Sequence, residues 1–180
     1  MSIAPAAKVR PEKSTPTRRG IAIFADGADA RQMVSALASG LVKGFTTNPT
    51  LMAKAGVRDY DAFGREVLAV VRDLPISFEV SVDDLPGMAR QARKLASWGD
   101  NVYVKLPVTN TRGDSTMSLV RELSAEGLKI NITAVLTLEQ IRGVTASVHE
   151  KTPAICSVFA GRIADTGLDP MPVMREAVRI

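Results

Sequence analysis

The chain has 180 residues, 46% of them hydrophobic, with a single cysteine and a single histidine. This length and composition predict one domain with one core. One cysteine, Cys156, excludes a disulfide within the chain and is expected to be a small core residue, and one histidine excludes a metal site built from several histidines. No apolar run approaches the roughly 20 residues that span a bilayer, so we expect a cytoplasmic protein with no membrane partner.

The net charge of +4 resides in residues 1–20. This segment carries five positive charges against one negative charge, from Lys8, Arg10, Lys13, Arg18, Arg19 and Glu12. It contains no aromatic residue and no apolar core of signal-peptide length. We therefore predict a basic, disordered extension over residues 1–20 and a folded domain over 21–180, with no nucleic-acid function.

Strand-like and helix-like segments alternate along the folded part. Short runs rich in β-branched residues predict strands at 21–26, near 44, and at 76–82, 102–108, 130–135 and 154–159. Apolar residues at helical spacing predict helices after Asp29, Asp59, Asp84, Asp114 and Thr137, and another over 171–180. This alternation is typical of an α/β fold with a parallel sheet.

Polar residues alternate with apolar residues along several of these strands, as Ser77, Glu79, Asn131 and Thr133 do. An antiparallel sheet with one wet face has the same alternation, but the intervening helices argue against it. A doubly wound sheet buries apolar residues on both faces, whereas a barrel points alternate side chains inward, where polar groups converge. We therefore predict a TIM (β/α)8-type barrel.

The predicted elements amount to six strand–helix units before Ile180. Because a closed barrel of this type has eight strands, the sequence predicts a barrel truncated after about six βα units, either a fragment or a chain completed by another. Two open sheet edges would favour self-association as a homo-oligomer.

Lys105 lies within the apolar run 102–108. Moving an ammonium group out of water is costly, so burial favours the neutral amine. A neutral amine is the nucleophile that Schiff-base chemistry with a carbonyl compound requires. The alternative is a lysine at a strand end that reaches water or pairs with a carboxylate.

Six ordered motifs accompany the predicted strands. They are Phe24-Ala25-Asp26-Gly27, Gly44-Phe45-Thr46-Thr47-Asn48-Pro49-Thr50, Glu79, Val104-Lys105-Leu106-Pro107, Ile130-Asn131-Ile132-Thr133 and Ser157-Val158-Phe159-Ala160-Gly161-Arg162-Ile163. In this order and spacing they resemble the transaldolase family, including its relatives the fructose-6-phosphate aldolases. The resemblance extends from about residue 21 to the end of the chain.

The resemblance implies an enzyme of carbohydrate metabolism, in the pentose phosphate pathway, that needs no cofactor and no metal. It would transfer a dihydroxyacetone unit between sugar phosphates through a Schiff base on Lys105. Asp26 would be the base that moves the proton of a substrate hydroxyl. Glu79 and Thr133 would hold a water that shuttles protons.

The resemblance also implies how the substrate is bound. Asn48 and Asn131 would bind sugar hydroxyls, Ser157 would line the pocket, and Arg162 would clamp the phosphate with its planar fork. Phe159 separates the two branches of the family, because a phenylalanine is expected there in transaldolases and a tyrosine in the aldolases. The sequence therefore favours the transferase.

Two other functions stay open, an aldolase-type lyase and an inactive truncated barrel that binds sugar phosphate or a partner. Each candidate residue also has a structural interpretation. These alternatives are a helix cap for Asp26, a turn for Asn48, an ion pair with Asp165 or Asp169 for Arg162, and backbone hydrogen bonds for Thr133 and Ser157.

Overall fold

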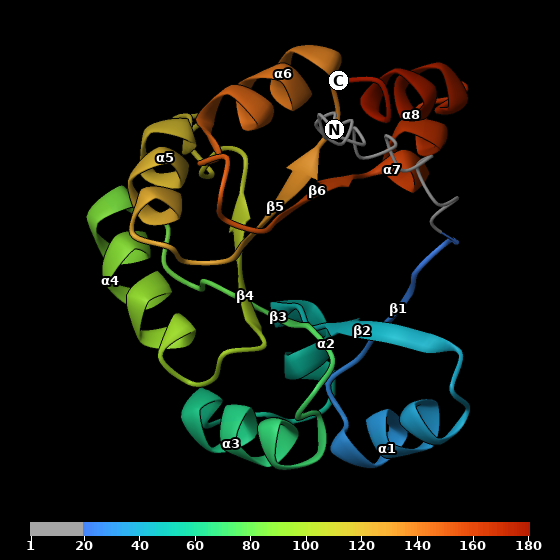
Figure 1. The fold of residues 1–180 in the computed structure, drawn as a ribbon, viewed down its shortest axis with the longest axis vertical. Helices are drawn as coiled ribbons and strands as arrows, with labels where there is room; N and C mark the ends of the chain where they lie inside the picture. The colour runs from blue at the N-terminus through green and yellow to red at the C-terminus, as the bar shows by residue number, and fades with distance from the viewer. Residues whose placement is uncertain (1–19) are drawn as a thin grey trace, which may run out of the picture.

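The computed structural model describes residues 20–180, so nearly all of the predicted basic extension lies outside the described residues. Six strands form one parallel sheet in sequential order. They are β1 (Ile23–Asp26), β2 (Val42–Thr46), β3 (Ile76–Glu79), β4 (Val102–Pro107), β5 (Ile130–Val135) and β6 (Ala154–Val158). The sheet curls, and helices lie outside the curve (Figure 1). The predicted fold class is thereby confirmed: these are six βα units of a TIM-type barrel.

Five helices alternate with the strands on the outer side of the sheet. They are α1 (Ala30–Ala38), α3 (Tyr60–Val70), α4 (Leu85–Ala96), α5 (Met117–Ala125) and α6 (Leu138–Ser147). Four of them begin where predicted, because the side chains of Asp29, Asp59, Asp84 and Thr137 accept hydrogen bonds from the first-turn N–H groups. Helix α5 follows Thr116 instead of Asp114.

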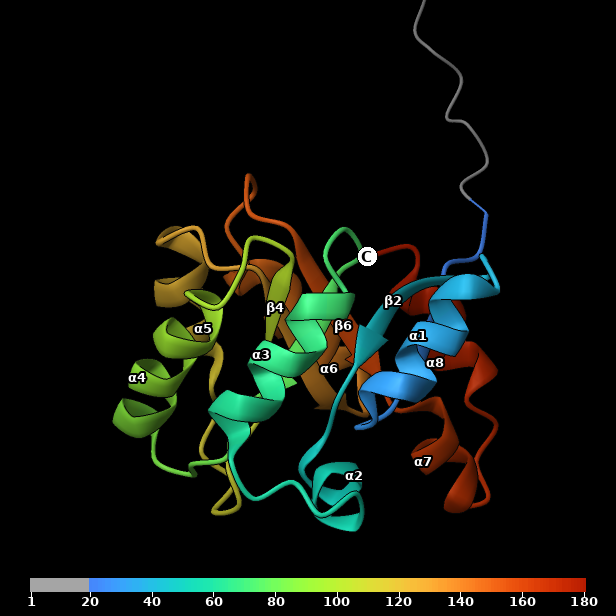
Figure 2. The same ribbon diagram turned by 90° about the horizontal axis from the view of Figure 1, so that it is seen from below.

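The predicted last helix is α8 (Met171–Ala177), and two further short helices were not predicted, α2 (Pro49–Lys54) and α7 (Ala160–Asp165). Both lie beyond the C-terminal end of a strand, α2 after β2 and α7 after β6, at the same end of the sheet (Figure 2). They therefore flank the place where the strands of a barrel enzyme present their functional residues.

The core lies between the sheet and the outer helices. Outward-facing strand residues such as Phe78, Val104, Leu106 and Ile132 are fully buried. The opposite, inward face carries the polar residues that the sequence pattern identified. Strand β3 is shorter than the predicted strand 76–82, since it ends at Glu79. Beyond this end, the N–H of Ser81 donates a hydrogen bond to the side chain of Gln91 on α4.

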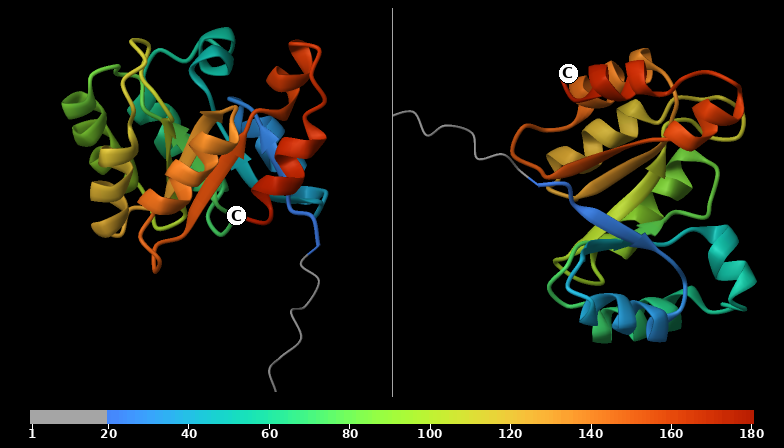
Figure 3. Two further views of the ribbon diagram at one scale, coloured as in Figure 1. Left: turned by 90° about the horizontal axis from the view of Figure 1, so that it is seen from above. Right: turned by 90° about the vertical axis from the view of Figure 1, so that its right-hand side faces the viewer.

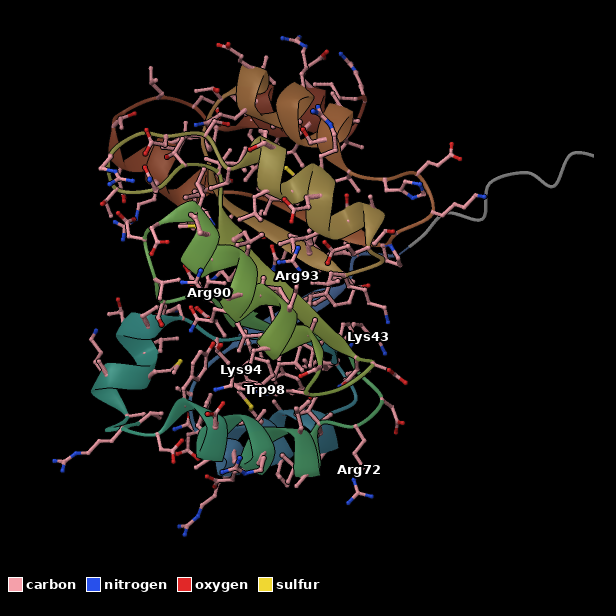
Figure 4. All side chains as sticks on the ribbon, turned by 90° about the vertical axis from the view of Figure 1, so that its left-hand side faces the viewer. Lys43, Arg72, Arg90, Arg93, Lys94 and Trp98 are labelled. Carbon is pink, nitrogen blue, oxygen red and sulfur yellow. The ribbon has the colours of Figure 1, made fainter. Side chains whose placement is uncertain are left out.

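Charged side chains on α4 tie it to both neighbouring helices. Arg93 contacts Glu122 and Glu126 of the α5 region at 2.5 and 2.6 Å, and Lys94 contacts Asp61 of α3 at 2.7 Å. Figure 4 shows Arg93 and Lys94 on the outside of this helix. Such exposed pairs are screened by water and contribute little to stability, so the apolar core carries most of the packing.

Strands β1 and β6 form the two edges of the sheet (Figure 3). On β1, Ile23 and Phe24 are 54% and 37% exposed. The prediction that Cys156 is a core residue was wrong, because this thiol is exposed. It lies on β6 in an open depression beside Val144, Val148 and Thr152, so the edge strand is incompletely covered.

Candidate active site

A cavity of about 680 Å³, lined by polar and apolar side chains, opens at the C-terminal end of the strands. All nine residues that the sequence predicted for the site line it: Asp26, Asn48, Glu79, Lys105, Asn131, Thr133, Ser157, Phe159 and Arg162. They come from β1, β3, β4, β5 and β6, and from the start of α2 and α7. Parallel strands bring their carboxyl ends together, so residues that are far apart in the chain, such as Asp26 and Arg162, line one cavity.

Lys105 is at the centre of this group. Its side chain is 11% exposed, and its Nζ lies 3.3 Å from Oε2 of Glu79 and donates to the carbonyl of Thr47 at 3.2 Å. The parallel register places Lys105 between Glu79 on β3 and Asn131 on β5. The sequence left two alternatives to a catalytic lysine, contact with water at a strand end and pairing with a carboxylate. The structure contains the pairing, with Glu79, and places it inside the cavity and not at the surface.

Glu79 is held in a low-dielectric environment, with its side chain 18% exposed. Burial raises the pKa of the Glu79 carboxyl above its ordinary range; Lys105 opposes this effect, and Asp26 adds to it. Desolvation therefore outweighs the ion pair. A carboxyl group tuned in this direction can exchange protons nearer to neutral pH than a free glutamate can.

This balance predicts a pH dependence of stability. A carboxyl group with a higher pKa in the folded state binds more protons when folded, so its stabilising contribution is present at low pH and lost as the pH rises. We expect the free energy of unfolding of the wild-type protein, relative to Glu79→Gln, to fall as the pH rises above 4.5. Denaturant titrations of both proteins over about pH 4 to 7 measure this difference. A relative gain in wild-type stability over that interval would mean that the ion pair with Lys105 outweighs burial.

Asp26 faces the cavity from the end of β1. Its carboxylate accepts hydrogen bonds from Oγ1 of Thr46 at 2.8 Å and from Nδ2 of Asn48 at 3.1 Å. The helix-cap alternative for Asp26 was wrong, since Asp29 caps α1. The structural alternative for Asn48 was a turn; its Oδ1 instead accepts from the N–H of Leu51 and caps the start of α2. It thereby links a helix N-terminus to the carboxylate.

Thr133 presents a buried hydroxyl at the cavity. Its hydroxyl is buried and makes no hydrogen bond within the described residues, so the predicted backbone alternative was wrong. The next residue, Ala134, has the left-handed φ of 59°, at a point where the register between β5 and β6 shifts. A non-glycine residue in this conformation is strained and is commonly found at functional sites.

Asn131 and Ser157 form a hydrogen-bonded group with a third residue, Ser77. Nδ2 of Asn131 donates to Oγ of Ser77 at 3.0 Å, and Oγ of Ser157 donates to Oδ1 of Asn131 at 2.7 Å. Asn131 is 1% exposed. The backbone alternative for Ser157 was therefore wrong, because its partner is a side chain.

Arg162 and Phe159 close the cavity on the side of α7. Arg162 pairs with Asp165 at 3.2 Å, as its structural alternative predicted, and its side chain is 75% exposed. It also lines the cavity, so a ligand anion can compete with Asp165 for the guanidinium. The backbone N–H of Phe159 donates to the carbonyl of Val135, which fixes the start of α7 against β5.

Several residues that shape the site had no predicted role. Thr46 binds Asp26, Thr47 binds the Lys105 amine through its carbonyl, and the hydroxyl of Tyr60 donates to the carbonyl of Glu79 at 2.9 Å. Burial raises the pKa of Tyr60, which keeps the phenol protonated as a donor. The Thr-Thr-Asn-Pro motif contained the first two residues, whereas nothing in the sequence pointed to Tyr60.

Among residues 20–180, no three His, Cys, Asp or Glu side chains are grouped so that they could hold a metal ion. In the same part of the chain, no helix has the length and apolar character needed to cross a bilayer.

The βα units of a TIM-type barrel, with a cavity at the C-terminal ends of the strands, are the arrangement in which barrel enzymes build their active sites. The family model described as transaldolase/fructose-6-phosphate aldolase matches residues 23–180. The chain belongs to this family, whose members are aldolases and transferases.

Individual relatives agree with this assignment. A protein named probable transaldolase from Dehalococcoides mccartyi is 35% identical over 159 residues, which are 88% of this chain and 69% of the relative. One with the same name from Roseiflexus sp. is 38% identical over 158 residues, again 88% of this chain and 69% of the relative. Another from Methanococcus maripaludis is 37% identical, over 87% of this chain and 68% of the relative.

Proposed function

We propose that the protein is a transaldolase that transfers a dihydroxyacetone unit from a ketose phosphate to an aldose phosphate through a Schiff base on Lys105. The observation that carries this proposal is a buried amine, 3.3 Å from Glu79, in a cavity that Asp26 also lines. The amine of Lys105 is the nucleophile for Schiff-base formation, and the carboxylates of Glu79 and Asp26 are the acid–base groups for forming the Schiff base and for cleaving the carbon–carbon bond.

The first stage forms the iminium. Glu79 takes a proton from the Lys105 ammonium group beside it, the neutral amine attacks the ketone carbon, and a proton passes from the nitrogen to the former carbonyl oxygen to give a carbinolamine. Glu79 returns a proton to that hydroxyl, which leaves as water, and the nitrogen lone pair forms the C=N bond. The unpaired hydroxyl of Thr133 supports this step, since a buried hydroxyl in this position can hold the water that passes between Glu79 and the substrate.

The second stage breaks the carbon–carbon bond. Asp26 takes the proton of the substrate C4 hydroxyl, the C3–C4 bond breaks, and its electron pair moves into the iminium to give an enamine. The aldose phosphate leaves, and the enamine attacks the aldehyde of the acceptor, whose new hydroxyl receives the proton from Asp26. Thr46 and Asn48 hold the carboxylate from both sides, which fixes the direction in which it takes the proton.

Polar groups around the lysine account for substrate binding. Asn48 and Ser157 face the same cavity as Lys105, and we assign them to the hydroxyls of the bound sugar. Asn131 lies in the same lining; one N–H of its amide donates to Ser77 and its Oδ1 accepts from Ser157, and we assign its second N–H to a sugar hydroxyl. Arg162, at the cavity rim, is proposed to exchange Asp165 for the substrate phosphate.

A fructose-6-phosphate aldolase is the second candidate, because the matched family includes both activities. The two differ in their need for an acceptor. With fructose 6-phosphate as donor, a transaldolase forms glyceraldehyde 3-phosphate at a rate that depends on an added aldose phosphate such as erythrose 4-phosphate. Equal release of glyceraldehyde 3-phosphate without an acceptor would assign the lyase instead. An absence of both activities would favour the inactive barrel.

Phe159→Tyr is expected to shift the protein from transfer toward simple aldol cleavage. Phe159 lines the same cavity as Lys105, and a phenol there can hold and polarise a water that a phenyl ring cannot. We expect transfer to decrease and free dihydroxyacetone to increase, at similar thermal stability. If Phe159 acts through packing alone, a hydroxyl without a partner costs about 1–3 kcal/mol, and both activities fall together with the melting temperature.

A further inference from the structure

The backbone of Glu79 lies where the hydrogen bonding between β2 and β3 ends. Immediately before this point, the N–H of Thr47 donates to the carbonyl of Ser77 at 3.0 Å. Bonds between parallel strands are evenly spaced and come from every second residue, so residue 49 would be the next donor, to the carbonyl of Glu79. Residue 49 is Pro49, whose nitrogen carries no hydrogen. The carbonyl of Glu79 therefore receives no ladder bond from this side.

The side chain of Tyr60 supplies the missing donor, since its hydroxyl donates to the carbonyl of Glu79 at 2.9 Å. The direction of this bond is fixed, because a carbonyl oxygen can only accept. The N-cap Asp59 directly precedes Tyr60 and sets the start of α3. The phenol ring packs edge-on against Trp98 and Phe78, with 5.4 and 6.2 Å between ring centroids. The hydroxyl is thus presented to β3 by a capped helix and two aromatic contacts.

The peptide group between Glu79 and Val80 is bound on its other side as well. The N–H of Val80 donates to the carbonyl of Lys105 at 3.1 Å. Because a peptide group is planar, the two bonds together fix the orientation of the backbone at Glu79. The side chain of Glu79 leaves the strand at this point and reaches the Lys105 amine at 3.3 Å.

We propose that Tyr60 is a positioning residue, whose hydroxyl replaces the N–H that Pro49 lacks and holds Glu79 where it exchanges protons with Lys105. This inference rests on the proposed function, in which Glu79 is the acid–base group of Schiff-base formation. Tyr60 does not line the cavity, so it acts through Glu79 and not on the substrate.

The anchoring of Glu79 is tested without any turnover. Tyr60→Phe keeps the ring and removes the hydroxyl. In the 15N-labelled protein, we expect the N–H of Val80 to exchange with solvent about tenfold faster in this variant, the worth of one hydrogen bond. The N–H of Val104, bound to the carbonyl of Lys129 at 2.8 Å in the same sheet, should exchange as in the wild type. An equal increase at both groups, or none at Val80, would overturn the proposal.

The effect on Schiff-base formation is measured in the Asp26→Asn background, where slow cleavage lets the adduct report the first stage alone. Protein is mixed with fructose 6-phosphate, quenched with borohydride at successive times, and analysed by mass spectrometry. We expect Tyr60→Phe to slow adduct formation by about tenfold. Tyr103→Phe is the matched control, since Tyr103 lies on β4 and does not line the cavity; its rate should stay within about twofold.

Glu79→Gln distinguishes positioning from general damage to the fold. If Tyr60 acts through Glu79, adding Tyr60→Phe to Glu79→Gln should slow adduct formation no further. A second tenfold loss in that background would mean a role independent of Glu79 and would overturn the proposal. If the wild-type protein forms no adduct with fructose 6-phosphate, the proposed function fails, and the exchange rate of Val80 decides by itself whether Tyr60 holds Glu79.

Discussion

Lys105→Met is expected to lower the rate of dihydroxyacetone transfer from fructose 6-phosphate by about 10³-fold or more. The substitution removes the nucleophile but keeps an unbranched side chain of similar length in the buried position. Glu79 would lose its ion-pair partner at 3.3 Å; because burial already raises the pKa of this carboxyl, it can become protonated and remain in the fold. The measurement is kcat/KM for transfer, together with a thermal melt that checks folding.

Lys43→Met is the matched control for this variant. Lys43 also lies on a strand, β2, but it is exposed and its amine donates to the carbonyl of Gly40. We expect its activity to stay within about twofold of the wild type. A folded Lys105→Met protein that retains a tenth of the wild-type activity would contradict a Schiff base at this lysine.

Asp26→Asn should separate the two stages of the reaction. The side chain keeps its size but loses the base, so carbon–carbon cleavage is expected to fall by roughly 10² to 10⁴-fold. Formation of the Schiff base should survive, because Glu79 and not Asp26 lies next to the Lys105 amine. The experiment compares the rate of cleavage with the yield of the borohydride-reduced adduct.

Asp29→Asn is a control with the same chemical change three residues further along the chain. Asp29 caps α1, and asparagine caps a helix about as well as aspartate. Its activity should therefore match the wild type. If Asp26→Asn loses adduct formation and cleavage to the same extent, Asp26 acts on the fold or on the lysine and is not the base for cleavage.

Much of the fold follows from local signals in the sequence. The order of strands and helices was predictable because strand runs and apolar helical spacing are local, and because helix caps such as Asp59 and Asp84 directly precede the helices they begin. The helices α2 and α7 have six residues each, and so short a segment gives too few positions for a periodic pattern. The exposure of Cys156 depends on how completely α6 covers the edge strand, which no local pattern reports.

The membership of the site was also predictable, because alternate residues of parallel strands point to one side and strand ends converge. The hydrogen-bond partners of these residues were not predictable from the sequence. The bond from Asn131 to Ser77 spans 54 positions in the chain, and the left-handed backbone at Ala134 has no signal in its side chain. The bond between Arg162 and Asp165 was predictable as an alternative because the two residues lie three positions apart on one helix.

The Schiff base on Lys105 is tested most directly by trapping it. The 180-residue chain is incubated with fructose 6-phosphate and sodium borohydride, digested, and analysed by mass spectrometry, with Lys105→Met treated in parallel. We predict one substrate-derived adduct, located on the peptide that contains Lys105 and absent from the variant. An adduct on another lysine, or no adduct on a folded wild-type chain, would contradict the proposed mechanism.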